Sequence, residues 1–460
     1  MKHVLIVAYY FPPVAATGAM RPLGFCRYLS TYGWTPHVIT TTPKSVYPSH
    51  PVDERLSGKL PSTIKVEAIP YTSTLDRLIH FRKLIRGWVG RRGNGPISAG
   101  GNHALKVKTD EPKNSQYIGQ LKRFVLDRLF AFPDPQSAWM EPVLKHVASL
   151  AEVKRPDLVF ATGSPWTSLV VARELGRRLR VPFIVDFRDP WASNAAFHYI
   201  SPQLIRKTES LERQICQEAA AVIANTSELR QHLTTIYPEI EGKCIAIPNG
   251  FHADDFTLST ASCGNQCLPR VGIEVCHFGT MYMMRTPVEL LRALLELVEE
   301  GAIGKTQLRL RFIGTWDVRS DECERMAQDL EKHGVLLREP PISHQECLRQ
   351  MASADALLTM QPGSTLQIPA KIYEYIATQR PLIVIGDPGA TFNLVERHRL
   401  GVCCSNQAPA IKRLFTELIR NPARIVAPSK DDAALFDYKN LTGQLAEVFD
   451  RADGVGKGEN

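Results

Sequence analysis

A strand-like stretch followed by a helix-like stretch recurs through most of this sequence, and this alternation constrains the fold more than any other feature. Residues 2–8 form a continuous apolar run, as expected for a strand buried on both faces of a parallel sheet. A loop leads to Gly18, and residues 20–32 then carry apolar side chains near helical spacing before Gly33. This order predicts a doubly wound α/β sheet.

The alternation continues and then starts a second time. In the first series, further strands are predicted at residues 37–41, 158–162, 183–186 and 221–224, with helices at 166–179 and 204–218. After a pause at Asn249-Gly250, a second series has predicted strands at residues 275–278, 309–313, 356–360 and 382–385, and helices at 287–299, 321–333, 344–352 and 372–377. The chain of 460 residues therefore predicts two Rossmann-like domains.

The expected boundaries follow the pattern. Residues 1–255 make an N-terminal domain with a basic insertion near 77–130, and residues 256–272 make a linker. Residues 273–430 make the second domain, and residues 431–460 a C-terminal helix that crosses back to the first. Two such domains face each other across a cleft, where ligands bind beyond the carboxyl ends of the strands.

Composition narrows the class of protein. The chain is 44% hydrophobic and 22% charged, which is typical of a soluble globular protein, and it has no apolar run of the roughly 18 residues that a membrane span needs. The short apolar N-terminus indicates a strand and not a signal peptide. Ten cysteines lie without metal-binding spacing, so we expect reduced thiols and a cytoplasmic protein.

The basic residues are concentrated in one segment. The net charge is +8, and residues 77–128 hold 12 Lys and Arg against 3 Asp and Glu, a difference of +9. Apolar residues recur at helical spacing among these cations at 78–92 and 121–132, which predicts docking on an anionic membrane surface. The alternative is a helix packed on the domain with a solvated basic edge. Since no RNA-binding motif accompanies the charge, we do not expect nucleic acid as a partner.

Two loops of the first domain carry candidate site residues. Gly18 precedes a helix whose N-terminus can receive a phosphate, although the same glycine can simply make the turn. The loop is not a GxGxxG, which disfavours a dinucleotide dehydrogenase. Asp186 and Asp189 follow a strand and can bind a hydroxyl or act as a base. The alternative is an ion pair between one of these acids and Arg188 that fixes the loop.

Two loops of the second domain complete the set. Gly279 and Thr280 end a strand, and Arg285 lies beside a helix that starts near Pro287, where its guanidinium can bind a diphosphate. Lys371 and Glu374 are three residues apart at the start of a helix, so they share one face. They can hold a phosphate and a ribose diol, or form only a surface ion pair.

Taken in order, these motifs resemble the retaining nucleotide-sugar glycosyltransferases of glycosyltransferase family 4, which have the GT-B fold. The matches are Phe11-Pro12-Pro13 with Gly18, Ile247-Pro248-Asn249-Gly250-Phe251, the stretch from Gly279 to Arg285, and Pro369 to Pro381. The resemblance implies that Gly18, Gly279, Thr280, Arg285, Lys371 and Glu374 bind the donor.

The resemblance further implies a mechanism. Arg285 and Lys371 stabilise the leaving diphosphate, and Asp186 or Asp189 positions the acceptor hydroxyl, which attacks with retention and without a catalytic metal. The expected co-substrate is a UDP- or GDP-sugar, and the expected acceptor is a glycan or lipid-linked glycan of the cell surface. The enzyme would then work in the cytoplasm, peripherally on the inner face of the membrane.

Two positions depart from the family pattern. Thr280 stands where the family usually has Arg, and Leu366 occupies the first position of its Glu-x7-Glu pair, where the Glu contacts the transferred sugar. Gln367 or a backbone amide of residues 362–365 can substitute. The alternatives are a nucleotide-sugar epimerase of the same fold and a degenerate GT-B scaffold that has lost transfer.

Overall fold

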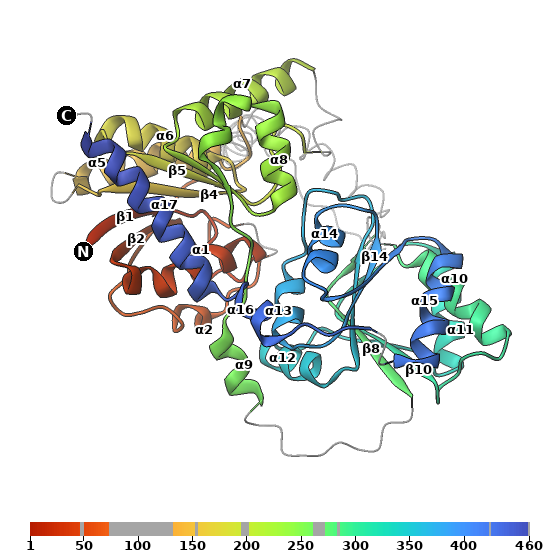
Figure 1. The fold of residues 1–460 in the computed structure, drawn as a ribbon. Coiled ribbons are helices and arrows are strands. Elements are labelled where there is room, and N and C mark those ends of the chain that lie inside the picture. Colours follow the sequence, from red (N-terminus) through yellow and green to blue (C-terminus); the bar gives the residue numbers. More distant parts are fainter. Residues whose placement is uncertain are drawn as a thin grey trace, which may run out of the picture.

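Two parallel β-sheets, each flanked by helices, make up the computed structural model of this protein (Figure 1). The structure describes residues 1–46, 50–72, 132–151, 155–194, 202–260, 272–282, 286–422 and 425–458. The basic segment near 77–130, including both amphipathic stretches apart from Phe132, lies outside the described residues.

The N-terminal sheet has seven strands, all parallel to their neighbours, in the order β3-β2-β1-β4-β5-β6-β7. Its strands are β1 (Lys2–Val7), β2 (Trp34–Thr41), β3 (Lys65–Ile69), β4 (Leu158–Gly163), β5 (Phe183–Phe187), β6 (Ala221–Ala224) and β7 (Cys244–Ala246). The associated helices are α1 (Thr17–Tyr28), α2 (Glu54–Ser57), α5 (Met140–Ala151), α6 (Thr167–Leu179), α7 (Pro202–Glu218), α8 (Ser227–Ile236) and α9 (Ala253–Thr260).

The C-terminal sheet has six parallel strands in the order β12-β10-β8-β13-β14-β15. Its strands are β8 (Ile273–Phe278), β10 (Leu308–Ile313), β12 (Leu336–Glu339), β13 (Ala356–Gln361), β14 (Leu382–Gly386) and β15 (Gly401–Ser405), and a separate short pair joins β9 (Met281–Tyr282) to β11 (Trp316–Asp317). The helices are α10 (Val288–Glu299), α11 (Asp321–Lys332), α12 (His344–Ser353), α13 (Lys371–Ala377), α14 (Ala390–Arg397), α15 (Ala408–Arg420), α16 (Lys430–Ala434) and α17 (Tyr438–Gly458).

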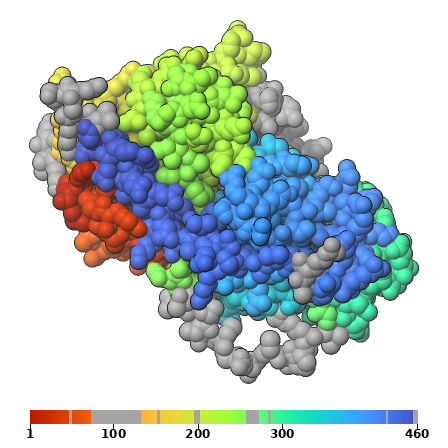
Figure 2. Space-filling model, viewed as in Figure 1, coloured from red at the N-terminus to blue at the C-terminus, as the bar shows by residue number. Residues whose placement is uncertain are grey.

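The last helix belongs to the first domain. In Figure 1, α17 lies against α1 and the N-terminal sheet, and Figure 2 shows the blue C-terminal segment passing over the surface from one domain to the other. The apolar side of α17 completes a core cluster with β1, β2 and β4, to which it contributes Tyr438, Leu441, Leu445, Ala446, Val448, Phe449 and Ala452. The N-terminal domain therefore needs the end of the chain for one face of its sheet.

The chain passes between the domains twice, and the two passages pair with each other. The amide of Phe251 donates to the carbonyl of Phe436 at 3.0 Å, and the amide of Tyr438 donates to the carbonyl of Phe251 at 2.9 Å. Both phenylalanines pack into the core of the C-terminal domain. Part of the predicted linker is helical, because α9 extends to Thr260, with Asp254 and Asp255 in its first turn and Phe256 packed on Phe251.

In each sheet the strand order reverses once, and this reversal sets the place of the site. Loops that leave β1 and β4 diverge in the first sheet, and loops that leave β8 and β13 diverge in the second. Such a switch point opens a crevice at the carboxyl edge of a parallel sheet. The two carboxyl edges therefore bring the loops after β1, β4, β5 and β6 toward the loop after β13.

Candidate functional site

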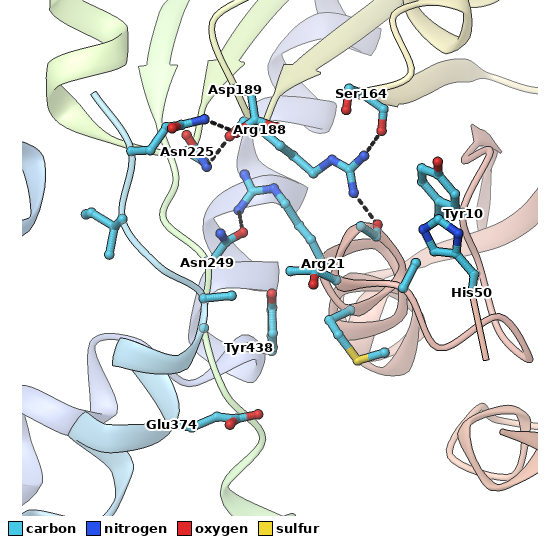
Figure 3. Close-up of a pocket in the computed structure, with 18 residues that line it drawn as sticks. Tyr10, Arg21, His50, Ser164, Arg188, Asp189, Asn225, Asn249, Glu374 and Tyr438 are labelled. Carbon is cyan, nitrogen blue, oxygen red and sulfur yellow. Dashed lines mark hydrogen bonds between the residues drawn. The ribbon is translucent and has the colours of Figure 1, made fainter. Parts of the chain in front are cut away.

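A cavity of about 320 Å³ lies between the two domains. Its N-terminal wall comes from the loops after β1, β4, β5 and β6, with Tyr10, Gly18, Ser164, Arg188, Asp189 and Asn225. Gln367, Ile368, Ala370 and Glu374 face them from the C-terminal domain, and Asn249, Gly250 and Tyr438 come from the two passages between the domains. Figure 3 shows Glu374 on one side of this cavity and Tyr10 and His50 on the other.

Gly18 lies at the cavity, but the space above it is filled by a side chain. A Cβ on Gly18 would overlap the guanidinium of Arg188 and touch the ring of Tyr10 at 3.0 Å. Arg188 donates to the carbonyl of Gly163 at 3.0 Å and to the carbonyls of Gly18 and Ser164. The glycine therefore admits Arg188, which ties the loop after β1 to the loop after β4.

Asp186 is fully buried below the cavity and does not line it. Its carboxylate accepts hydrogen bonds from the Arg21 guanidinium at 2.8 to 3.1 Å and from the Thr162 hydroxyl at 2.6 Å. Burial by itself lowers the pKa of the Arg21 guanidinium, but Asp186 outweighs this effect and the pKa is raised. The sequence analysis gave an ion pair with Arg188 as the alternative role of Asp186. Asp186 does form an ion pair, but its partner is Arg21.

Arg21 also binds the first passage between the domains. Its Nη2 donates to the carbonyl of Ile247 at 2.8 Å, and its Nη1 donates to the carbonyl of Pro248 at 2.7 Å and to Asn249 Oδ1 at 3.2 Å. The buried side chain of Arg21 thus connects α1 and β5 to residues 247–249, where the chain first passes between the domains. The floor of the cavity is fixed by these contacts.

Asp189 faces the cavity and bonds across it. Gln367 Nε2 donates to Asp189 Oδ1, while Gln367 Oε1 accepts from the hydroxyl of Ser364 at 3.0 Å. The neighbouring Leu366 packs into the core of the N-terminal domain, and its carbonyl accepts from the Thr226 hydroxyl at 2.8 Å. Of the two predicted acids, Asp189 is the one positioned to meet a ligand.

Glu374 lines the cavity from the first turn of α13. It interacts with His344 Nε2 at 2.9 Å and with Lys371 Nζ at 3.2 Å. Burial alone raises the pKa of the Glu374 carboxyl, but Lys371 and His344 outweigh it and lower the pKa to about 2. The group is therefore an anion at neutral pH, held at the C-terminal side of the cavity.

The remaining predicted site residues are not found in the lining of the cavity. Among the described residues, Gly279, Thr280 and Lys371 are not part of the cavity lining, although Lys371 is bonded to Glu374, which is. Arg285 lies outside the described residues. Gly279 adopts φ +141°, and its carbonyl abuts Gly314, so this turn needs two glycines in close approach.

The sequence analysis did not identify several residues of the site. Arg21 lies within a helix, Tyr10 and His50 lie in loops, and none of the three stands in a motif. His344 was placed only on a predicted helix, without a role. A useful signal was present for Arg21, since it lies beside the apolar positions of the helix predicted at 20–32, and an arginine that becomes buried there needs a carboxylate partner.

Comparison with known proteins adds a family match. The family model described as a glycosyl transferase 4-like domain matches residues 108–250, less than half of the chain. D-inositol 3-phosphate glycosyltransferase of Kineococcus radiotolerans is 24% identical over 184 residues, which is 38% of this chain. The chain spans 42% of the length of that curated relative.

Solved structures match over nearly the whole length. HepE of Anabaena, in complex with UDP and glucose, has 14% identity, a TM-score of 0.54 and 99% coverage of both chains. Sucrose-phosphate synthase of Thermosynechococcus elongatus has 14% identity, a TM-score of 0.61 and coverage of 99% of this chain and 100% of its own. A glycosyltransferase of Rickettsia africae has 14% identity, a TM-score of 0.57 and 98% coverage of both chains.

These matches confirm two predictions. The two-domain GT-B fold is present, and the resemblance to the glycosyltransferase 4 type is supported by the family model, the curated relative and the structural neighbours.

Proposed function

We propose that this protein, a GT-B chain of glycosyltransferase 4 type, transfers a sugar from a nucleotide-diphosphate sugar to an acceptor hydroxyl with retention. The observation that carries the proposal is that two carboxyl side chains line opposite walls of the interdomain cavity. Glu374, an anion at neutral pH, lies on one wall and Asp189 on the other. The structural neighbour HepE binds UDP and glucose, which favours a UDP-sugar donor.

The donor nucleotide is assigned to the C-terminal side. The ionised carboxylate of Glu374 can accept two hydrogen bonds from a ribose diol, and His344 and Lys371 hold it in place. Lys371 is proposed to meet the charge of the diphosphate together with Arg285, which lies outside the described residues. Burial alone lowers the pKa of Lys371, but Glu374 outweighs this and raises it, so the ammonium stays charged.

The transfer step breaks the bond between the sugar's anomeric carbon and the diphosphate oxygen, and the diphosphate leaves with the electron pair. The acceptor oxygen bonds to that carbon on the same face, and its proton passes to the departing diphosphate. Cations and helix N-termini stabilise the charge that develops on the leaving group. Asp189 positions the acceptor hydroxyl; Asp186 supports the floor through Arg21.

The main test is Glu374→Gln. We expect UDP to bind more weakly by about 1–3 kcal/mol, the range for a hydrogen bond to a charged group. Exposed Glu396→Gln is the matched control, since Glu396 lies on α14 and does not line the cavity. Titration calorimetry with UDP and GDP measures both variants, and hydrolysis of the UDP-sugar measures turnover.

Two results would contradict the proposal. Unchanged donor affinity and turnover in both Glu374→Gln and Arg285→Ala would show that the donor site is elsewhere. Failure of the unaltered protein to bind either nucleotide would favour the degenerate scaffold.

Metal independence is part of the proposal. Phosphate charge is met by Lys371, Arg285 and helix N-termini, so turnover should persist in EDTA. Loss of turnover in EDTA and its return with Mg²⁺ or Mn²⁺ would show that a divalent ion is needed.

The acceptor is proposed to be a glycan or lipid-linked glycan of cell-surface polysaccharide synthesis, reached from the cytoplasmic face of the membrane. None of the helices within the described ranges has the length and apolar character of a bilayer crossing. The amphipathic basic stretches at 78–92 and 121–132 motivate peripheral docking. Co-sedimentation with anionic and neutral vesicles at low and high salt tests it, and equally negligible binding to both would leave a soluble acceptor.

A further inference from the structure

The loop after β13 contacts both domains, and Leu366 is its point of contact with the core of the N-terminal domain. Leu366 does not line the cavity, whereas the next two residues, Gln367 and Ile368, do. Its side chain packs against the apolar cluster on one face of the N-terminal sheet. Of the residues described in the C-terminal domain, Leu366 alone packs against that cluster. One apolar side chain of the second domain is therefore held by the core of the first.

A hydroxyl of the N-terminal domain holds the backbone of the same residue. Thr226, 3% exposed at the N-terminus of α8, accepts from the amide of Leu229 at 2.9 Å and donates to the carbonyl of Leu366 at 2.8 Å. Its hydroxyl thus caps α8 and binds the loop at once. In Figure 1, α8 and α14 lie on the facing sides of the two domains, where Asn393 Nδ2 donates to Glu228 Oε1 at 2.7 Å.

The C-terminal domain fixes this loop from the other side. The amide of Ala390 donates to the carbonyl of Thr365 at 2.8 Å, and the Thr391 hydroxyl donates to the carbonyl of Gln367 at 3.2 Å. Gly389 permits this approach, because a Cβ there would lie 2.6 Å from both Cα and the carbonyl oxygen of Thr365. Since the loop is fixed to α14 in this way, separating the domains would pull its apolar side chain out of the N-terminal cluster.

The chemistry of position 366 suits this contact better than a place in the cavity. Two domains of one chain move relative to each other unless an apolar interface holds them, and withdrawing Leu366 from the cluster would return apolar surface to water. An ionised carboxylate at the same position could not remain in such apolar surroundings. The replacement of the Glu of the family pattern by Leu366 therefore has a physical consequence, which is a stronger contact between the domains.

We propose that Leu366 is a positioning residue that holds the two domains in the arrangement in which Gln367 bonds to Asp189, and that this arrangement forms before a donor binds. The contacts that support it are made between protein groups alone. Gln367 follows Leu366 directly, so the same contact sets the distance between the two walls of the cavity. Releasing it would separate Gln367 from Asp189, while Glu374 and its partners would stay together within the C-terminal domain.

The first test is small-angle X-ray scattering of the full chain with and without UDP. We expect the unaltered protein to have the same radius of gyration in both conditions. Leu366→Ala should raise the radius of gyration and Leu366→Glu should raise it further, because apolar surroundings exclude a carboxylate. Leu366→Met keeps the apolar volume and should match the unaltered protein. Leu337→Ala, at a leucine 42% exposed on β12, is the matched control.

A second pair of variants tests the same contact through Thr226. Thr226→Val removes the hydroxyl that bonds to Leu366 and should raise the radius of gyration, whereas Thr226→Ser keeps the hydroxyl and should not. This pair decides the question if Leu366→Glu does not fold. Thermal melting establishes which variants are folded.

The second test is turnover, and this test alone rests on the proposed transferase function. Hydrolysis of the UDP-sugar should fall by about tenfold to a hundredfold in Leu366→Ala, the effect of a small displacement of reacting groups. UDP affinity should stay unchanged, because the nucleotide contacts are assigned to the C-terminal domain. A general loss of structure would lower both, so a fall in turnover at constant UDP affinity is specific to the positioning role. Leu366→Met should restore turnover.

Three results would overturn the proposal. Compaction of the unaltered protein by UDP would show that the nucleotide, and not Leu366, brings the domains together. An unchanged radius of gyration in folded Leu366→Ala and Thr226→Val would show that the contact does not hold them. Faster turnover in Leu366→Glu than in the unaltered protein would place position 366 against the sugar. If the unaltered protein binds no nucleotide, the proposed function fails, and the scattering without UDP still decides whether Leu366 holds the domains.

Discussion

At the scale of single residues, the site depends on charges whose partners are far apart in the sequence. Arg21 and Asp186 are separated by 165 positions, yet they form a buried pair in the floor of the cavity. A sequence shows that Asp186 ends a strand, which correctly predicts its place near the carboxyl edge. It does not show which side chain neutralises the acid, because that partner is brought in by the packing of α1 on the sheet.

Arg21→Met should destabilise the protein by about 3–5 kcal/mol, because it leaves Asp186 buried without a counter-charge. Urea unfolding measures the change, and Arg292→Met, at a partly exposed ion pair, is the control, with less than about 1 kcal/mol expected. Adding Asp186→Leu to Arg21→Met should cost less than the sum of the two single changes. Strict additivity would show that the two side chains are not coupled.

Glu212 is a second buried charge, and its role is structural. It lies in α7, 2% exposed, where it accepts from the Tyr237 hydroxyl at 3.0 Å and from the amide of Ala192 at 3.2 Å. Burial raises the pKa of this carboxyl to about 7. Ala192 is close in sequence to Asp189, so Glu212 braces the loop that carries the cavity carboxylate.

The pH dependence of stability follows from that shift. Between about pH 4.5 and 7 the native state binds a proton at Glu212 that the unfolded chain releases, so this group's contribution falls as pH rises, by up to about 1.4 kcal/mol per unit. Above about pH 8 the contribution of Glu212 to the free energy of unfolding no longer changes with pH. Glu212→Gln should remove this slope, and exposed Glu209→Gln should keep it. Parallel curves of unfolding free energy against pH for Glu212→Gln and the unaltered protein would contradict the assignment.

At the scale of elements, the interior strands of both sheets were predicted and the edges were not. The predicted strands correspond to β1, β2, β4, β5 and β6 in one sheet and to β8, β10, β13 and β14 in the other. Four strands of these two sheets were missed, and they are the outermost ones: β3, β7, β12 and β15. The separate short pair of β9 and β11 was also not predicted. A strand buried on both faces reads as a continuous apolar run, whereas an edge strand such as β3, mostly exposed, gives no such signal.

Helix α17 provides a prediction at this scale. Phe449 is fully buried between Trp34 and Phe160, with ring centroids 5.3 and 5.4 Å away. Phe449→Ala should cost about 3–5 kcal/mol by opening a cavity under the helix. Leu435→Ala, at a side chain 50% exposed, should cost far less. A loss below about 1 kcal/mol for Phe449→Ala, measured by urea unfolding, would mean that α17 does not complete the core.

At the scale of the whole molecule, the two domains are connected by more than the chain. Thr226 bonds to Leu366 and Asp189 to Gln367, and Asn393 Nδ2 donates to Glu228 Oε1 at 2.7 Å. The two segments that connect the domains, at Phe251 and Phe436, add backbone hydrogen bonds to each other. Neither half is a closed unit, because α17 belongs to the first domain and Phe251 to the core of the second.

We therefore expect the two domains to unfold in one transition. Five of the six tryptophans fall within the first 250 residues, so fluorescence reports mainly the N-terminal domain, while far-ultraviolet circular dichroism reports both. The two midpoints in urea should coincide. UDP bound at Glu374 should raise the fluorescence midpoint and the circular-dichroism midpoint by the same amount, since it stabilises the native state as a whole. Separate midpoints would show that the domains are thermodynamically independent.

The position of α17 has a consequence for biosynthesis. Val4 and Ile6 leave the ribosome long before the helix that covers them, because α17 begins only at Tyr438. At about 5–20 residues per second, the exposed face of the sheet waits roughly 20–90 s for its cover. During that interval Trp34 and Phe160 of the nascent chain lack the side chains of α17 that cover them, so ribosome-bound chaperones should retain the chain until α17 has been synthesised.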